Sequence, residues 1–134
     1  MPSSTPTNIT LLPRGYELPA TTFTVSQQAV MDYTRAVGDG NAYGETIPPL
    51  GAVALGLAAL QEHVALPEGS LHTGQEVEQE AALRTAVPLT LNGRVAQRSE
   101  RQGFVVTVLE FEIAPEGGAG VRARATIMAP GGGS

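Results

Sequence analysis

Residues Ile47–Val64 read I-P-P-L-G-A-V-A-L-G-L-A-A-L-Q-E-H-V, and this stretch decides the fold. Between Leu50 and Leu60 no side chain is polar, whereas a helix on a protein surface has one apolar and one polar face. The run is too short to cross a bilayer, so it predicts a helix buried in the core of a folded domain. Pro48 and Pro49 suit the start of this helix, where a missing N–H costs little.

The chain on either side of this helix predicts an α+β fold. Before it, Thr21–Val25 has the pattern of an extended segment, and Ser26 is a suitable N-cap for a helix that Gly38 ends. After it, runs of period two bounded by Gly and Pro predict four strands. These strands are Leu71–Leu83, Pro88–Gln97, Gly103–Ile113 and Gly120–Met128. We expect a four-strand meander, a curved antiparallel sheet wrapped around one long buried central helix.

Length and composition restrict the function classes. With 134 residues we expect a single domain over residues 9–129, a disordered N-terminus at 1–8 and a flexible tail at 130–134. The absence of cysteine excludes disulfides, thiol catalysis and zinc–thiolate sites, and we expect no metal. The net charge of −5 argues against nucleic acid as a partner. No secretory or membrane segment is recognisable, so the expected location is the cytoplasm.

Three stretches, in order, resemble the MaoC-like dehydratases and hydratases of the hotdog fold. They are Phe23–Asn41, Ile47–Val53 and Leu71–Arg84, and they are most similar to the N-terminal or fatty-acid-synthase-like dehydratase branch. The resemblance implies a hotdog fold and a lyase of fatty acid metabolism, either an (R)-specific enoyl hydratase or a 3-hydroxyacyl dehydratase. It implies an acyl thioester of coenzyme A or of an acyl-carrier protein as substrate, and no further cofactor.

The resemblance also implies an incomplete catalytic dyad. Active members of this family carry G-D-x-N-P-x-H, in which the aspartate and the histidine act together on one water or proton. In this chain Gly38, Asp39 and Asn41 match the pattern, while Ala42 replaces the proline. Gly44 occupies the position of the histidine and has no group that holds a proton.

The resemblance places substrate contacts at the start of the central helix. Free amides and the helix dipole at that end polarise the thioester carbonyl. In this sequence the residues there are Leu50, Gly51 and Ala52, and glycine at position 51 lets a ligand approach the backbone. Asn41, in the preceding loop, completes the predicted substrate-binding set.

Few residues are available to replace the missing histidine. Tyr43 and Glu45 are the titratable groups beside the gap, and Glu45 is the candidate for a second catalytic group. His63 follows the central helix, roughly 20 Å from its amide end at ~1.5 Å per residue. His72 matches a histidine of the family's strand and is interpreted as a partly buried structural residue. Gln75 is interpreted as a sheet hydrogen-bonding residue.

Four functions remain open. The first is the non-catalytic half of a dimer, either a homodimer or a heterodimer with a catalytic MaoC-like subunit. The second is an autonomous, weak hydratase or dehydratase that uses Asp39 with Glu45 or His72. The third is a stand-alone acyl-thioester binding module. The fourth is a hotdog thioesterase using Glu45, although the central helix offers no carboxylate for such a reaction.

Overall fold

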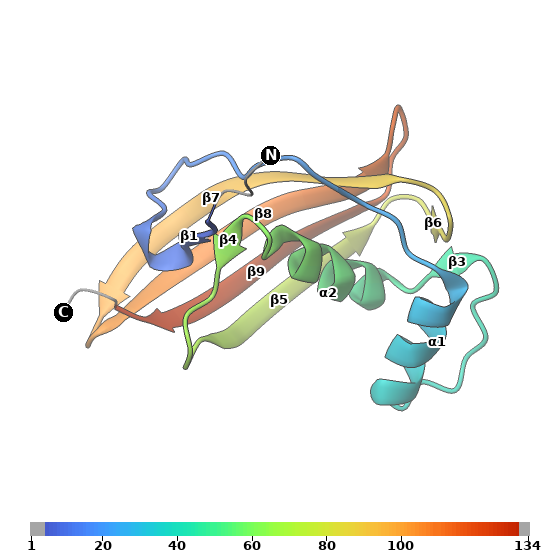
Figure 1. Ribbon diagram of the computed structural model, residues 1–134, viewed down its shortest axis with the longest axis horizontal. Coiled ribbons are helices and arrows are strands. Elements are labelled where there is room, and N and C mark those ends of the chain that lie inside the picture. The colour runs from blue at the N-terminus through green and yellow to red at the C-terminus, as the bar shows by residue number, and fades with distance from the viewer. Residues whose placement is uncertain (1–4, 132–134) are drawn as a thin grey trace.

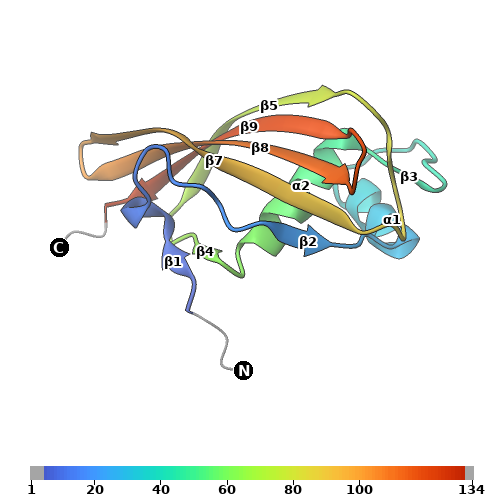
Figure 2. The same ribbon diagram turned by 90° about the horizontal axis from the view of Figure 1, so that it is seen from above.

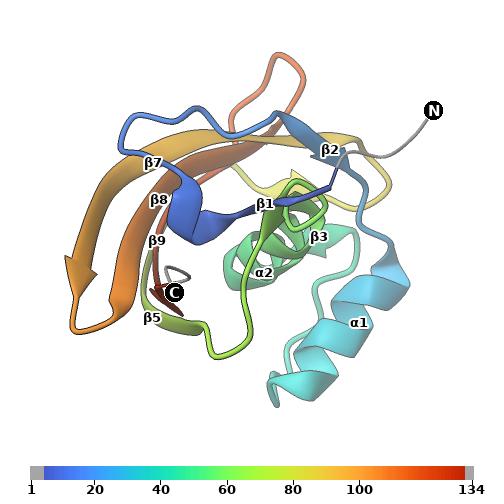
Figure 3. The same ribbon diagram turned by 60° about the vertical axis from the view of Figure 1, so that its left-hand side comes forward.

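The computed structural model describes residues 5–131 and has an α+β fold. A five-stranded antiparallel sheet curls round helix α2, Pro49–Leu60 (Figures 1 and 3). Across the sheet the strands are β2 (Thr21–Phe23), β7 (Leu89–Arg101), β8 (Phe104–Pro115), β9 (Val121–Pro130) and β5 (Leu71–Gln79). This arrangement is the hotdog fold that the sequence predicts.

The smaller elements lie around the two ends of α2 (Figure 2). At one end lie helix α1 and the two-residue strands β3 and β6; at the other lie strands β1 and β4, which are parallel to each other. The short 3-10 helix η1 follows β1 directly. Their bounds are β1 Thr7–Asn8, η1 Ile9–Leu11, α1 Gln27–Ala36, β3 Thr46–Ile47, β4 Val64–Ala65 and β6 Leu83–Arg84.

Helix α1 begins where the sequence predicts. The Ser26 hydroxyl accepts a hydrogen bond from the Ala29 N–H at 3.0 Å, which satisfies one of the free amides of the first turn. At the other end Gly38 has φ +73°, a left-handed conformation that glycine adopts without strain and that stops the helix. The loop that follows leads to β3 and then to α2.

Helix α2 packs very closely against the inner face of the sheet. A Cβ atom added to Gly56 would lie 2.6 Å from Ile113 Cδ1 and 3.3 Å from both Leu91 Cδ1 and Phe23 Cζ. Real Cβ atoms essentially never approach a neighbour as closely as 2.6 Å. Val53, on the same helix, is fully buried. The glycine that lowers helix propensity therefore lets the helix lie deep in the curved sheet.

One stripe of α2 remains exposed in the single chain. Leu50 is 53% exposed, and Ala54 and Ala58, one and two turns further on, are also exposed. The helix is thus central but has an uncovered apolar side. Among residues 5–131, no helix is both long enough and apolar enough to cross a membrane.

The position of β5 differs from the predicted four-strand meander. β7, β8 and β9 form a meander, but β5 pairs with β9 at the far edge of the sheet and not with β7, the next long strand. The predicted strand Leu71–Leu83 is also two elements, because β5 ends at Gln79 and Leu83–Arg84 form β6 with β3. Residues 80–88, which include β6, carry the chain from β5 at one edge of the sheet to β7 near the other edge. The alternation of residues within a strand does not show which strand it pairs with.

The predicted limits of the ordered chain also shift. Thr7–Asn8 pair with Val64–Ala65, so regular structure begins before the expected boundary at residue 9. Pro130, assigned to the tail, ends β9 and pairs with Phe104. The rest of the predicted terminal disorder, at 1–4 and 132–134, lies outside the described residues.

The Gly56 contact gives a stability prediction. Gly56→Leu should lower the free energy of unfolding by about 1–3 kcal/mol or more, because the new side chain overlaps Ile113 and forces the helix away from the sheet. Gly40→Leu is the control, since a Cβ there has no heavy atom within 4 Å, and it should change stability by no more than about 0.5 kcal/mol. Urea unfolding measures both; equal stabilities would contradict the close packing.

Candidate functional site

Asp39 lies in the loop between α1 and β3, with both oxygens of its carboxylate engaged. Oδ1 accepts the backbone N–H of Asn41 at 2.9 Å, and Oδ2 accepts the Tyr43 hydroxyl at 2.5 Å. The Asp39 N–H donates to the Thr34 carbonyl at 2.8 Å, which ties the loop to α1. The hydrogen bond from Tyr43, followed by the one from the Asn41 backbone, lowers the pKa of Asp39 below its usual value. Asp39 is therefore held ionised and organises this turn.

Tyr43 is bound to Asp39 in a way that disfavours its own ionisation. The hydrogen bond to the Asp39 carboxylate is the main cause that raises the pKa of the Tyr43 phenol. The phenol therefore stays protonated at neutral pH and donates to Asp39. From the sequence Tyr43 is only a neighbour of the gap, whereas in the structure its hydroxyl is the hydrogen-bond partner of Asp39.

Gly44, where the family's histidine would stand, adopts φ +60°. No heavy atom lies within 4 Å of a Cβ built at this position. The next turn is closed by the Thr46 N–H, which donates to the Tyr43 carbonyl at 3.0 Å. There is room for a larger side chain at residue 44, but the backbone conformation favours glycine.

The amides at the start of α2 are only partly available. The Ala52 N–H donates to the Pro48 carbonyl at 2.9 Å, so this predicted substrate contact is already used within the helix. Leu50 and Gly51 precede the first helical hydrogen bond, and no side chain caps this end of α2. A Cβ atom added to Gly51 would lie 3.1 Å from a carbon atom of Tyr33 and 3.1 Å from one of Pro48. The close approach of a ligand to the Gly51 backbone, which the sequence predicts, is therefore blocked on this side.

Glu45, the predicted second carboxylate, has an exposed side chain. Its backbone carbonyl accepts the Thr85 N–H at 2.8 Å and the Thr85 hydroxyl at 3.3 Å. These bonds attach the loop to the segment after β6. The contacts of Glu45 therefore position the loop, and its catalytic role stays a prediction.

A mainly apolar hollow of about 340 Å³ lies between the C-terminal half of α2 and strand β5. It does not include the loop around Asp39. Its walls come from α2, η1, β4, β5, β8 and β9 and from the segments that join them. The lining residues are Ile9, Ala54, Leu57, Ala58, Leu60, Gln61, Val64, Leu66, Ser70, Leu71, His72, Gln75, Leu109 and Ile127. Clefts of this size and composition are typical sites for small apolar ligands.

A β-bulge brings His72 and Gln75 to the same hollow. The register of β5 against β9 shifts between His72 and Gly74, so His72 pairs with Ile127 and Gln75 with Ala125. In a regular strand these two residues would lie on opposite faces. The sequence predicts a partly buried His72, but this residue is exposed at the hollow. Gln75, interpreted from the sequence as a residue that hydrogen-bonds within the sheet, also lines the hollow. Gly74 is the only sequence signal of this bulge.

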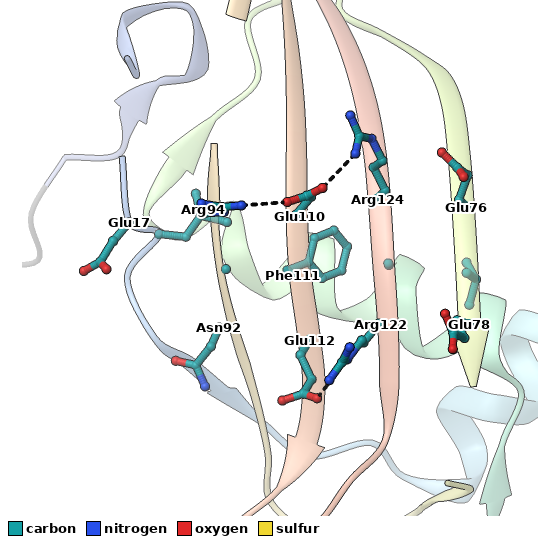
Figure 4. Close-up of a pocket in the computed structure, with 14 residues that line it drawn as sticks. Glu17, Glu76, Glu78, Asn92, Arg94, Glu110, Phe111, Glu112, Arg122 and Arg124 are labelled. Carbon is teal, nitrogen blue, oxygen red and sulfur yellow. Dashed lines mark hydrogen bonds and ion pairs between the residues drawn. The ribbon is translucent and has the colours of Figure 1, made fainter. Parts of the chain in front are cut away.

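A larger hollow, about 910 Å³, lies on the outer face of the sheet, away from α2. Figure 4 shows its alternating charges: Arg94 and Arg124 both pair with Glu110, at 3.3 and 2.7 Å. Two residues further along the same two strands, Arg122 lies 3.7 Å from Glu112. Small-molecule sites are mostly lined by apolar side chains, whereas this surface is charged and open. The smaller hollow is therefore the better candidate site.

Comparison with known proteins supports the fold. No family model matches the sequence, and a search of curated proteins found no match. Among solved structures, the (R)-hydratase from A. caviae involved in PHA biosynthesis has a TM-score of 0.70 and 18% identity, over 90% of this chain and 98% of that one. A MaoC-like dehydratase from Rhodospirillum rubrum has a TM-score of 0.69 and 13% identity, over 91% and 95%.

A complex is also among the similar structures. The C-terminally truncated HadBC complex, a 3R-hydroxyacyl-ACP dehydratase from Mycobacterium tuberculosis, matches with a TM-score of 0.66 and 17% identity, over 87% of this chain and 96% of that one. The chain therefore has the fold of the MaoC-like hydratases and dehydratases, which confirms the resemblance seen in the three sequence stretches.

The Asp39–Tyr43 contact gives a prediction about ionisation. In Tyr43→Phe the pKa of Asp39 should rise towards its usual value, because the hydrogen bond that lowers it most is lost. An NMR titration of the side-chain carboxyl carbons measures this pKa. Tyr16→Phe, a change on a different segment, should leave it unchanged; an unchanged Asp39 pKa in Tyr43→Phe would contradict the contact.

Proposed function

We propose that this chain binds acyl thioesters and serves as the non-catalytic half of a dimer, with weak hydratase or dehydratase activity at most. The observation that carries the proposal is Gly44 at φ +60°, in the place of the histidine, beside an Asp39 that is already bound by Tyr43 and Asn41. The chain has the fold of these enzymes and an apolar hollow, while the histidine of the resembled family is missing from its position. Binding without efficient proton transfer is the expected outcome.

The hollow beside α2 supports binding of an acyl chain. Ile127 and Leu109 lie deep in it, at 4% and 1% exposure, and Leu57 and Leu66 add further apolar wall. Transfer of each methylene from water into such a site is favourable by about 0.8 kcal/mol. The polar side chains that line it are those of Gln61, Ser70, His72 and Gln75, which suits a ligand with an apolar tail and a polar head.

The exposed stripe of α2 supports a dimer. Leu50, Ala54 and Ala58 form an uncovered apolar row beside β5, which within residues 5–131 pairs only with β9. Exposed strand edges and apolar rows are commonly covered by another chain. A two-fold axis perpendicular to α2 would turn the second helix antiparallel. The hollow of one chain would then lie near the amide end of the other helix, where an intact dyad in a related subunit would act.

The alternative functions have weaker support. A stand-alone binding module needs the same hollow but leaves the apolar row uncovered. A thioesterase using Glu45 requires that exposed carboxylate to reach a thioester, whereas the contacts of Glu45 are those of its backbone. Both alternatives are separated from the main proposal by the oligomeric state and by thioester hydrolysis assays.

The missing histidine gives a prediction about rate. The unmodified chain should hydrate 2-enoyl-coenzyme A thioesters about 10²–10⁴-fold more slowly than an enzyme with an intact dyad, because general acid–base catalysis contributes about that factor. Gly44→His should raise the rate, since a Cβ at this position meets no neighbour within 4 Å. The φ of +60° adds backbone strain, so the variant should be less stable than the unmodified chain, and its rate is measured on folded protein. The absorbance of the enoyl thioester measures hydration directly.

Two variants serve as controls for this rescue. Gly40→His places a histidine in the same loop, also in open space, and should produce no gain. Adding Asp39→Asn to Gly44→His should remove the gain. A robust rate from the unmodified chain would refute the non-catalytic interpretation, and Glu45→Ala and His72→Ala would then show which group acts.

The apolar row on α2 gives a prediction about assembly. The chain should be a dimer by light scattering at micromolar concentration, and Ala54→Arg should make it monomeric by placing a charge in the contact. Asn92→Arg, on the outer face of the sheet, should leave the dimer intact. A monomer before any substitution would contradict the homodimer and would favour a partner of different sequence.

A further inference from the structure

Residues 7–11, which precede the first strand of the five-stranded sheet, are held in place by several hydrogen bonds. β1 pairs with β4, and the Thr7 N–H donates to the His63 carbonyl at 3.0 Å. The next turn, η1, is capped by the Asn8 side chain, which accepts from the Thr10 N–H at 2.9 Å. Arg98, on β7, donates to the Thr10 carbonyl at 2.9 Å. These bonds fix η1 against the sheet.

The two apolar side chains of η1 point in opposite directions. Ile9 is fully buried, whereas Leu11, on the same turn, is 72% exposed. Ile9 is also part of the lining of the hollow between α2 and β5. The turn therefore presents one side chain to the hollow and one to solvent.

Burial distinguishes the floor of the hollow from its rim. The floor consists of residues at most 4% exposed: Ile9, Leu60, Val64, Leu109 and Ile127. The rim consists of exposed residues: Ala54, Ala58, Gln61, Leu71, His72 and Gln75. Four floor residues belong to α2, β4, β8 and β9, and Ile9 alone comes from the turn that precedes the sheet.

We propose that Ile9 limits the length of the acyl chain that this hollow admits, and is a specificity-determining residue; this rests on the proposed function. An acyl chain that enters at the rim ends against the floor, where the Ile9 side chain takes up space. A shorter side chain at position 9 deepens the hollow and leaves the helix and the sheet strands unchanged. A different side chain at position 9 would therefore change the preferred length of the acyl chain without changing the fold.

The test compares chain-length profiles of binding. Dissociation constants are measured by calorimetry for saturated acyl-coenzyme A thioesters from butanoyl to hexadecanoyl, with the unmodified chain, Ile9→Val, Ile9→Ala and Leu11→Ala. Ile9→Ala should shift the preferred chain to one longer by about two carbons and bind it about tenfold more tightly than the unmodified chain does, which is about 1.4 kcal/mol. Ile9→Val should shift the profile in the same direction by less.

Leu11→Ala is the matched control, because it makes the same kind of deletion on the same turn but on the exposed side. It should leave the profile unchanged. Ile9→Ala removes a buried side chain and lowers stability, so Ile9→Val gives the answer if Ile9→Ala does not fold. Binding with identical profiles in the unmodified chain and in the folded Ile9 variants would overturn the role of Ile9 alone. Absence of binding of every thioester by the unmodified chain would overturn the proposed function and the role of Ile9 with it.

Discussion

The contact between α2 and the sheet at Gly56 determines the rest of the structure. Because residue 56 has no side chain, the helix lies directly on Ile113, Leu91 and Phe23. The strands curve around a helix held this close, and the short connections at its two ends follow from its position (Figure 3). The same packing leaves the opposite stripe of the helix without a cover, so one contact gives both the hotdog shape and the apolar surface.

The two parts of the candidate site lie along this one helix. The loop with Asp39 precedes its amide end, and the apolar hollow adjoins its C-terminal half. The helix spans about 18 Å at ~1.5 Å per residue. The hollow is present, and residue 44 of the loop is a glycine, at the position where the resembled family carries its histidine. This combination fits a chain that contributes a binding surface to an assembly in which another subunit performs the chemistry.

Local sequence signals predict local structure well in this protein. The Ser26 cap, the apolar helix and the alternation of β7, β8 and β9 are all found where the sequence places them. The misses concern contacts between distant segments. The pairing of β5 with β9 depends on a long crossing, and the burial of Ile9 depends on where the chain's first turn docks. Neither feature produces a periodic pattern of apolar residues in the sequence.

The sequence predicts the parts of the candidate site that depend on a local motif and misses those that depend on the path of the backbone. The absence of a histidine at position 44 is readable from one motif, and so is Asp39. The bond from Tyr43 and the bulge that turns His72 towards the hollow depend on backbone geometry, with Gly74 as the only hint. A one-residue shift in a strand exchanges its faces, so the side of His72 was not predictable from alternation alone.

The proposed function requires that this chain holds an acyl thioester in the hollow beside α2. The most direct measurement is an NMR titration of the ¹⁵N-labelled protein with a saturated acyl-coenzyme A thioester. We predict saturable shifts of the amides of Leu57, Leu60, His72 and Gln75, with smaller changes at Leu50 and Gly51. Shifts confined to the outer face of the sheet, around Glu110 and Arg124, or no saturable shifts at all, would contradict it.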